Sequence, residues 1–361
     1  MKQYRVAVVG ATGMVGQRFL SLLEGHPWFR TVAVAASPRS AGQSYGQAVA
    51  GRWMMDRLIP GNVLDMTVLD ASDVKTISSQ VDFIFCAVDM QKDEIRALEE
   101  AYAKTETPVI SNNSAHRTTP DVPVLIPEIN PEHAQIITAQ RNRLGTQRGF
   151  IAVKPNCSIQ SYVPVLTPLR AFGVKEVSVC TYQAVSGAGR TLESWPEMYD
   201  NIIPYIGGEE EKSEQEPLKV WGSLAEDGIQ SATEPVISAQ CIRVPANDGH
   251  LAAVSVRFAE KPSREEILAA WSNWETVPQQ LGLPSAPKPF LKYFDEPDRP
   301  QTRLDRNEGR GMAVTIGRLR EDSIMDWRFV ALSHNTLRGA AGGGMLSAEF
   351  LCKEGWIQPK E

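Results

Sequence analysis

The chain is poor in cysteine and histidine, with five of each among 361 residues. The cysteines are scattered along the sequence and form no Cys-x-x-Cys pair; they are Cys86, Cys157, Cys180, Cys241 and Cys352. An odd, scattered set indicates neither a disulfide framework nor a zinc site. We therefore expect no bound metal.

Long apolar runs and basic clusters are also lacking. No apolar run reaches the ~18 residues that a membrane span needs, and the first residues enter a strand-like segment without a secretory signal. The formal net charge is −6 with no basic block, which disfavours nucleic acid as a partner. The length and the ordinary composition suit two globular domains. The sequence predicts a cytoplasmic protein that acts on a small molecule and has neither membrane nor nucleic acid as a partner.

A glycine-rich turn follows the first strand. Residues 4–9 are valine-rich, as a strand buried on both faces should be, and the run Gly10-Ala11-Thr12-Gly13-Met14-Val15-Gly16 follows them before an apolar-periodic segment. Strand, glycine turn and helix in this order are typical of a dinucleotide site, and a plain tight turn is the alternative. The cofactor contacts expected here are Gly10, Thr12, Gly13, Met14 and Val15.

The second strand, residues 31–36, ends in Ser37-Pro38-Arg39-Ser40. An enzyme that prefers NAD usually has an acidic residue at this place to hold the ribose hydroxyls. Ser37, Arg39 and Ser40 instead suit the 2′-phosphate of NADP(H) through charge-assisted hydrogen bonds. The alternative is that Arg39 is a solvated loop residue, and we favour NADP(H).

Further buried strands are expected at residues 81–88 and 108–113. The loop after the latter carries Asn113 and Arg117. Ligands bind beyond the carboxyl ends of such strands, so Arg117 faces either the active cleft or solvent.

Cys157 lies in the tetrapeptide Pro155-Asn156-Cys157-Ser158, after a strand-like segment at 150–153 and before a helix expected at 158–171. The amides of a helix's first turn have no intrahelical acceptor, so they favour a thiolate and an oxyanion nearby. The position indicates a nucleophile. On position alone, a buried small apolar side chain is the commoner alternative.

The remaining pattern predicts a second domain of another kind. Strands expected at 176–183, 239–244 and 251–258, with a long polar insertion at 187–235, favour a mixed or antiparallel sheet. Gly339–Gly344 should open a C-terminal helix that returns to the first domain and brings Asn335 beside the cofactor. The fold class is thus α/β: a Rossmann-type domain (residues 1–153, completed by about 335–361) and an α+β catalytic and dimerisation domain with a mixed sheet (residues 154–334).

Few histidines are available as the acid or base partner of Cys157. His26 and His133 are interpreted as surface residues. His116 stands in the polar loop before Arg117, and His334 precedes Asn335 near the C-terminal glycines. His250 follows a glycine at the entrance of a strand, which could present its imidazole to a cleft. It is the candidate base.

The motifs together resemble a known family. Four segments carry the likeness, namely Gly10–Gly16, Pro155–Ser158, Gln183–Gly189 and Arg243–His250, and Asn335 followed by Arg338-Gly339-Ala340-Ala341 adds to it. Over essentially its full length the chain resembles aspartate-β-semialdehyde dehydrogenases, in the archaeal and fungal branch more than in the common bacterial one.

The resemblance implies an activity and catalytic roles. L-aspartyl-4-phosphate would be reduced with NADPH to L-aspartate-4-semialdehyde, on the route to lysine (through diaminopimelate), threonine and methionine. Cys157 would form an acyl-thioester, and His250 would be the general acid/base. Gln183 would orient the substrate, and Asn156 would help the backbone amides at residues 157–158 stabilise the oxyanion.

Binding roles follow from the same resemblance. Arg243 would hold the substrate α-carboxylate, which suits a guanidinium, and Glu209 would hold the α-amino group. Lys212 and Arg117 would contact the phosphate, with Asn113 in the same loop. Ser186, Gly187 and Asn335 would line the nicotinamide side. A homodimer or homotetramer is implied, with the sheet of the second domain as its interface.

Two rival functions stay open. Archaeal malonyl-coenzyme A reductase resembles this family closely, and N-acetylglutamyl-phosphate reductase resembles it more distantly. Glu209 favours an amino-bearing substrate. The rival from another class is a non-catalytic NADP-binding regulator.

Overall fold

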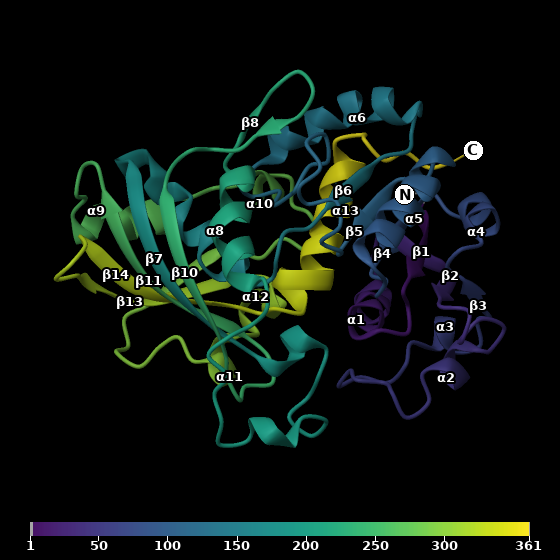
Figure 1. Ribbon diagram of the computed structural model, residues 1–361, viewed down its shortest axis with the longest axis horizontal. Coiled ribbons are helices and arrows are strands. Elements are labelled where there is room, and N and C mark those ends of the chain that lie inside the picture. The colour runs from purple at the N-terminus through teal and green to yellow at the C-terminus, as the bar shows by residue number, and fades with distance from the viewer. Residues whose placement is uncertain (1–2, 361) are drawn as a thin grey trace.

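The structure is a computed structural model that describes residues 3–360. A parallel sheet and a mixed sheet lie at opposite ends of the molecule, and the C-terminal helix α13 (Gly342–Lys353) lies between them (Figure 1). None of the helices in this described range is long and apolar enough to cross a bilayer.

The first sheet has six parallel strands in the order β3-β2-β1-β4-β5-β6. Its strands are β1 (Tyr4–Val9), β2 (Phe29–Ala36), β3 (Val68–Asp70), β4 (Phe83–Cys86), β5 (Val109–Ser111) and β6 (Ile151–Val153). The accompanying helices are α1 (Met14–Leu23), α2 (Tyr45–Ala48), α3 (Gly61–Leu64), α4 (Val74–Gln80), α5 (Lys92–Lys104) and α6 (Ile137–Leu144). The strand order reverses between β1 and β4, where a doubly wound sheet binds its nucleotide. The Rossmann-type half of the predicted fold class is confirmed.

The second sheet is mixed, with the order β10-β7-β11-β14-β13-β12. Its strands are β7 (Val174–Gln183), β10 (Val236–Arg243), β11 (His250–Phe258), β12 (Leu291–Phe294), β13 (Val314–Glu321) and β14 (Trp327–Ser333). The outer pairs β10–β7 and β12–β13 are parallel and the central pairs are antiparallel. The mixed sheet was predicted, although its last three strands were not.

Side chains alternate between the two faces of this sheet. Val177 and Val254 point into a core that also holds Leu166 and Trp271. The remaining helices of this half are α7 (Val163–Leu166), α8 (Glu209–Val220), α9 (Arg264–Ser272), α10 (Val277–Gln280), α11 (Thr302–Asp305) and α12 (Glu308–Gly311), and a short hairpin joins β8 (Ser223–Leu224) to β9 (Ile229–Gln230). The polar insertion thus contains a regular helix, α8, which packs beside β10.

The segment after Cys157 differs from the continuous helix expected at 158–171. It forms a 3₁₀ turn (Ser158–Ser161), the single turn α7 and a second 3₁₀ turn (Pro168–Phe172). Pro164 and Pro168 lack the amide hydrogens that a continuous helix needs, which explains the breaks. Cys157 therefore does not lie at the start of a long α-helix.

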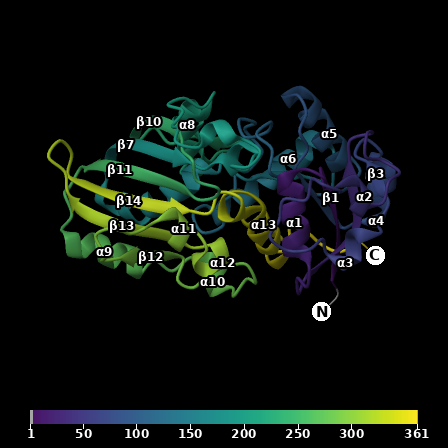
Figure 2. The ribbon, with the colours of Figure 1, turned by 90° about the horizontal axis from the view of Figure 1, so that it is seen from below.

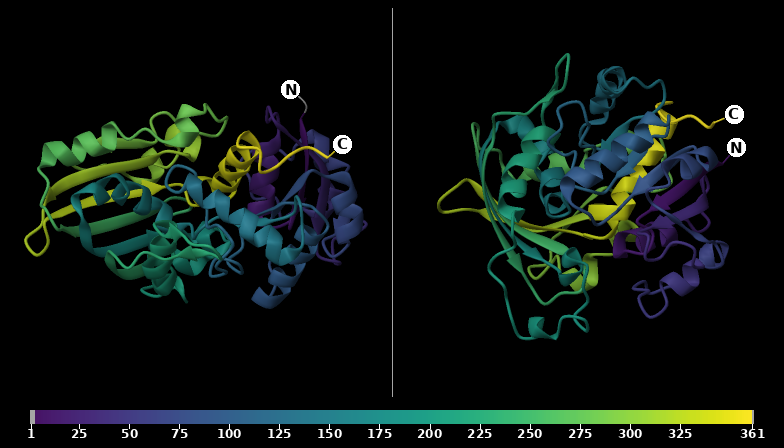
Figure 3. Two further views of the ribbon diagram at one scale, coloured as in Figure 1. Left: turned by 90° about the horizontal axis from the view of Figure 1, so that it is seen from above. Right: turned by 45° about the vertical axis from the view of Figure 1, so that its right-hand side comes forward.

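The C-terminal segment crosses back to the first sheet, as Figure 2 and both views of Figure 3 show. The π-helical turn η6 (Leu337–Ala341) leads into α13, whose Met345 and Leu346 share a core with Val6 and Phe19. The exact division at residues 153 and 154 stays a prediction.

Candidate active site

Cys157 and His250 face each other although 93 residues separate them, with Sγ and Nε2 3.5 Å apart. Cys157 comes from the turn after β6, and His250 is the buried first residue of β11. Nδ1 of His250 accepts a hydrogen bond from the Ala184 amide at 3.1 Å. The neutral ring must therefore carry its proton on Nε2, directed at the sulfur.

Burial, followed by the nearby Arg243 guanidinium, holds the pKa of His250 well below its ordinary value. The imidazole is neutral at physiological pH. Burial, followed by the Glu209 carboxylate, raises the pKa of Cys157 above its ordinary value, and Lys154, Arg117 and Arg243 offset only part of that rise. The thiol thus depends on neighbouring side chains other than His250 for positive charge.

Arg243 and Gln183 end neighbouring strands, since they are register partners in the β10–β7 pair. Arg243 is buried and donates from Nη1 to the Ala184 carbonyl at 2.8 Å. Both side chains line a cavity of about 470 Å³ that also contains Cys157. A buried guanidinium at this place suits a carboxylate ligand.

Glu209, the first residue of α8, lines the same cavity. Both of its carboxylate oxygens accept from Asn156 Nδ2 at 3.0 Å, one accepts from Lys212 Nζ at 2.8 Å, and Gln183 Nε2 lies 3.4 Å from the other. Burial acts to raise the pKa of Glu209, but the bonds from Lys212, Asn156 and Gln183 outweigh it and the pKa falls. Glu209 is an anion poised for a cationic ligand group.

Asn156 also organises the nucleophile turn. Its Oδ1 accepts from the Ser158 amide at 2.7 Å and from the Ser158 hydroxyl at 2.6 Å. The Ser158 amide, expected to help stabilise an oxyanion, is therefore already bonded to a side chain.

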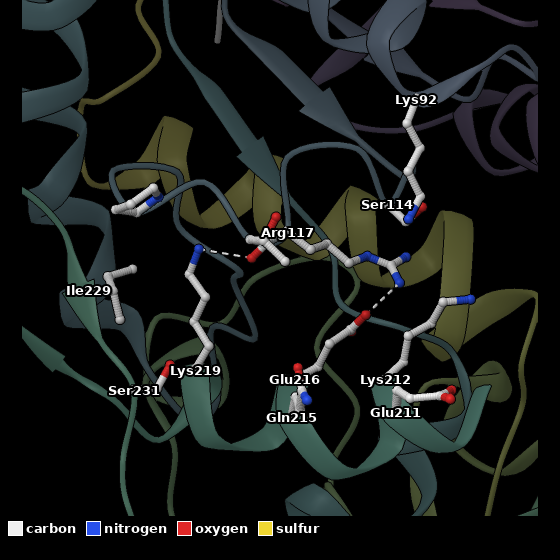
Figure 4. Close-up of a pocket in the computed structure, with 12 residues that line it drawn as sticks. Lys92, Ser114, Arg117, Glu211, Lys212, Gln215, Glu216, Lys219, Ile229 and Ser231 are labelled. Atoms are coloured by element: carbon white, nitrogen blue, oxygen red, sulfur yellow. Dashed lines mark hydrogen bonds and ion pairs between the residues drawn. The ribbon is translucent and has the colours of Figure 1, made fainter. Parts of the chain in front are cut away.

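The expected phosphate contacts Arg117 and Lys212 line two cavities. One is the cavity of Cys157, called the main cavity below, and the other adjoins it and has a volume of about 310 Å³. Arg117 Nη1 pairs with Glu216 at 2.9 Å, and Lys219 Nζ donates to the Arg117 carbonyl at 2.9 Å (Figure 4). Helix α8 thus holds the loop that carries Arg117, and two cations face one end of the site.

Asn113 lies differently from the rest of this loop. Its side chain donates to the buried Glu99 carboxylate at 2.8 Å, whereas its neighbours Asn112 and Ser114 line the main cavity. Asn113 therefore supports the loop from behind.

In the glycine turn, packing requires a glycine at two of the three positions. At Gly10, where φ is +91°, a Cβ would lie 2.2 Å from the Ala87 carbonyl oxygen, and at Gly16 it would lie 2.2 Å from the Gly10 oxygen. Gly13 is exposed, and a Cβ there would contact only the Gly10 oxygen, at 3.6 Å. The turn therefore packs tightly against the sheet at Gly10 and Gly16, whereas Gly13 is open to solvent.

The other expected cofactor residues lie in two places, around the glycine turn and after the end of β2. Thr12, Met14 and Val15 are partly exposed in the turn and the start of α1. Beyond the end of β2, Ser37 and Arg39 are exposed and Ser40 is buried. Arg39 is thus free of burial and accessible to an anionic ligand.

On the nicotinamide side, Asn335 joins two separate segments. Its Oδ1 accepts from the Gly249 amide and its Nδ2 donates to the Ser186 hydroxyl, both at 2.8 Å. A Cβ at Gly187 would lie 3.0 Å from His250 Nε2. All three expected residues, Ser186, Gly187 and Asn335, line the cavity of Cys157.

Sequence reasoning assigned no role to several residues that line this cavity, among them Lys154 and Gly339. A Cβ at Gly339 would lie 2.8 Å from Cys157 Cβ, so the crossing segment packs directly against Cys157. The one feature of the sequence that could have indicated a role for Lys154 is its position directly before the Pro155–Ser158 motif.

The interpretation of His26 and His133 as surface residues is wrong. Both are buried: His26 Nε2 lies 2.9 Å from the Glu349 carboxylate, and His133 Nε2 lies 3.0 Å from the Gly222 carbonyl. Their partners are far away in sequence, so the polar residues beside them were misleading.

Comparison with known proteins identifies the family. The models of the semialdehyde dehydrogenase NAD binding domain and dimerisation domain match residues 5–137 and 166–338. The aspartate-semialdehyde dehydrogenase of Schizosaccharomyces pombe is 42% identical over 358 residues, covering 97% of this chain and 98% of that protein. That of Methanothermobacter thermautotrophicus is 44% identical over 349 residues, covering 96% and 98%. The chain belongs to the aspartate-semialdehyde dehydrogenase family.

A solved aspartate-semialdehyde dehydrogenase extends the likeness to three dimensions. The crystal structure of the Candida albicans enzyme with NADP has a TM-score of 0.88 and 37% identity, covering 99% of this chain and all of that one. The predicted family, its archaeal and fungal affinity and its two-part fold are confirmed. The matching dimerisation domain also supports an oligomer for this member of the family.

Proposed function

We propose that this protein is an NADP-dependent aspartate-semialdehyde dehydrogenase that reduces L-aspartyl-4-phosphate to L-aspartate-4-semialdehyde and catalyses the reverse phosphorylating oxidation. One arrangement carries the proposal. A thiol and an imidazole 3.5 Å apart share a cavity with Arg243 and Glu209, and with the cations Arg117 and Lys212. These charges complement an α-carboxylate, an α-amino group and a phosphate on one small substrate. Such an enzyme would serve lysine, threonine and methionine biosynthesis.

Cys157 acts as the acyl carrier. Its thiolate attacks the C4 carbonyl carbon of the aspartyl phosphate, a C–S bond forms, and the bond to the phosphate oxygen breaks. The phosphate leaves with the electron pair, stabilised by Arg117 and Lys212. Splitting the reaction in this way replaces one difficult step by two easier ones.

The site fits NADP(H). Gly13 leaves space for the pyrophosphate, Arg39 is exposed for a 2′-phosphate, and Ser186 and Asn335 lie beside Cys157. When bound, NADPH supplies the hydride that reduces the thioester carbonyl.

His250 acts at Nε2. Because Nδ1 is occupied by the Ala184 amide, the ring offers an N–H to the negative oxygen of the thiohemiacetal on Cys157. When the C–S bond breaks, the electron pair returns to the sulfur as thiolate and the aldehyde is released. In the oxidative direction the same N–H stabilises the oxygen after the thiolate attacks the aldehyde. We therefore propose that His250 acts at this step as a hydrogen-bond donor, a more limited role than the general acid/base that the resemblance implies.

We propose a homodimer, alone or paired into a homotetramer, formed through the open face of the mixed sheet. The centre of that face is made by small or apolar side chains in register, with Ala253 opposite Cys180 on one side and Val330 on the other. All three are partly exposed. A cytoplasmic location stays a prediction.

Substrate comparison tests the function. We expect the purified enzyme to reduce NADP when given L-aspartate-4-semialdehyde and phosphate, with a clear preference over NAD. Activity with malonyl-coenzyme A and NADPH instead, without phosphate, would assign the rival reductase. Glu209 disfavours that rival, because a malonyl group has no amine for this carboxylate to bind. NADP binding together with an unreactive Cys157 would favour a regulator.

A further inference from the structure

Lys154 stands three residues before Cys157, and it is only 3% exposed. Its amide donates to the Ser111 carbonyl at 2.9 Å, and its carbonyl accepts from Arg117 Nε at 3.1 Å, so its backbone is fixed beside β5. Its Cδ lies 3.4 Å from where a Cβ at Gly343 would stand. The ammonium donates to the Pro155 carbonyl, and the side chain lines the cavity that holds Cys157.

A thiolate in this cavity needs a positive charge that the expected groups do not supply. His250 is neutral, since its Nδ1 accepts from the Ala184 amide. The segment after Cys157 is a four-residue 3₁₀ turn, and the Ser158 amide is bonded to Asn156. Neither an imidazolium nor the start of a long helix therefore balances the sulfur.

Three of the cationic side chains that line the cavity, Lys154, Arg117 and Arg243, act on Cys157. Burial and Glu209 raise the pKa of the thiol, and Lys154 opposes them ahead of Arg117 and Arg243. Arg117 is paired with the Glu216 carboxylate at 2.9 Å, whereas Lys154 and Arg243 each donate to a neutral backbone carbonyl, that of Pro155 and that of Ala184.

We propose that the ammonium of Lys154 is the counter-ion of the Cys157 thiolate and sustains its reactivity near neutral pH. The inference rests on the proposed role of Cys157 as the nucleophile. Lys154 acts through the sulfur, so it is a supporting residue of the reaction.

The surroundings of Lys154 fit this role. The titratable and charged groups that act on Lys154 come from four segments of the chain. They are Arg117 in the loop after β5, Cys157, the pair Glu209 and Glu216 on α8, and His250 on β11. Burial and Arg117 lower the pKa of Lys154 to about 7, against the opposing effects of Cys157 and the two glutamates. Ionisation of the thiol therefore favours the ammonium form, and the ammonium in turn favours the thiolate.

Alkylation of the ligand-free, full-length enzyme tests the proposal. The rate at which iodoacetamide modifies Cys157 is measured against pH by mass spectrometry of the peptide that contains it. We expect Lys154→Met to raise the titration midpoint by about one pH unit or more, and to slow alkylation at neutral pH about tenfold. Lys154→Arg should retain most of the reactivity. Lys104→Met, which removes an exposed lysine of α5, should match the wild type.

A second comparison separates the two possible partners of the sulfur. His250→Gln should shift the midpoint less than Lys154→Met does. A wild-type profile for Lys154→Met, or a larger shift for His250→Gln, would overturn the proposal. Circular dichroism and NADP affinity establish that each variant is folded, and Lys154→Gln replaces the methionine variant if that one is not. A wild-type Cys157 no more reactive than a free thiol would instead refute the proposed function.

Discussion

Gly187 leaves no room for a side chain beside the reactive pair. A Cβ there would lie 2.9 Å from Arg243 Nη1 and 3.0 Å from His250 Nε2. We expect Gly187→Ala to fold but to lower kcat/KM by about 10- to 100-fold, because small displacements of reacting groups are costly. Steady-state kinetics measure this. Gly61→Ala is the matched control, since no atom lies within 4 Å of its added methyl. Equal activity of the two variants would contradict the close packing.

Lys154 also affects stability, and its burial lowers the stability of the folded protein near neutral pH. Its pKa is lowered from 10.5 to about 7 in the folded protein, chiefly by burial. Between these values the unfolded chain binds more protons than the folded one, so the contribution of this lysine to stability rises with pH. Lys154→Met should therefore have a higher Tm than the wild type near pH 7, and the difference should shrink as the pH approaches 10.5. Thermal unfolding measured across this pH range tests the prediction. A difference in Tm that stays constant or widens as the pH rises would contradict it.

At the scale of elements, the crossing turn η6 connects the two sheets and places Gly339 against Cys157. A buried ion pair holds it: both nitrogens of the Arg338 guanidinium's fork bond the Glu128 carboxylate, and Arg338 Nε donates to the Met312 carbonyl at 3.0 Å. The turn is thus fixed to the loop before α6.

Removal of one partner should be severe. We expect Glu128→Ala to lower the free energy of unfolding by about 3–5 kcal/mol, because Arg338 would remain as an unpaired buried charge. Urea unfolding measures the change. The surface pair offers a control: Glu234→Ala, which loses the exposed partner of Lys175, should cost about 1 kcal/mol or less. A cost for Glu128→Ala no larger than that of the control would show that the pair does not hold the turn.

Elements with local signals were predictable from the sequence. The glycine turn after β1 and the apolar strands β7 and β11 follow from residues within a short window. The helix after Cys157 was not, because Pro164 and Pro168 break a pattern whose apolar spacing looked helical. A local apolar pattern is enough to locate a strand. It does not predict a continuous helix where prolines remove the backbone hydrogen bonds that such a helix needs.

The burial and charge state of residues that depend on partners far away in the chain could not be predicted from the sequence. The burial of Lys154 depends on Gly343 and Arg117, and that of His26 depends on Glu349. The proton position on His250 likewise follows from a bond to Ala184 that only the β7–β11 pairing creates. The residues of the site could be named, but their charge states could not.

At the scale of the whole molecule, the open face of the mixed sheet should hold two copies together. Ala253 lies at its centre, between Cys180 and Val330. We expect Ala253→Glu to shift the oligomer toward monomer, since it places a charge on the apolar centre of an interface. Sedimentation velocity measures the change. Ala50→Glu makes the same substitution at an exposed turn of the other half and should leave assembly unchanged. Identical sedimentation of both variants would place the interface elsewhere.

The central claim is that Cys157 carries the acyl group through the whole reaction. The most direct measurement is phosphate-dependent NADP reduction by L-aspartate-4-semialdehyde with the Cys157→Ala variant, after confirming that it still binds NADP. We predict a loss of about four orders of magnitude or more in kcat relative to the wild type, as removal of a covalent nucleophile produces. Turnover within about tenfold of the wild type would contradict the account.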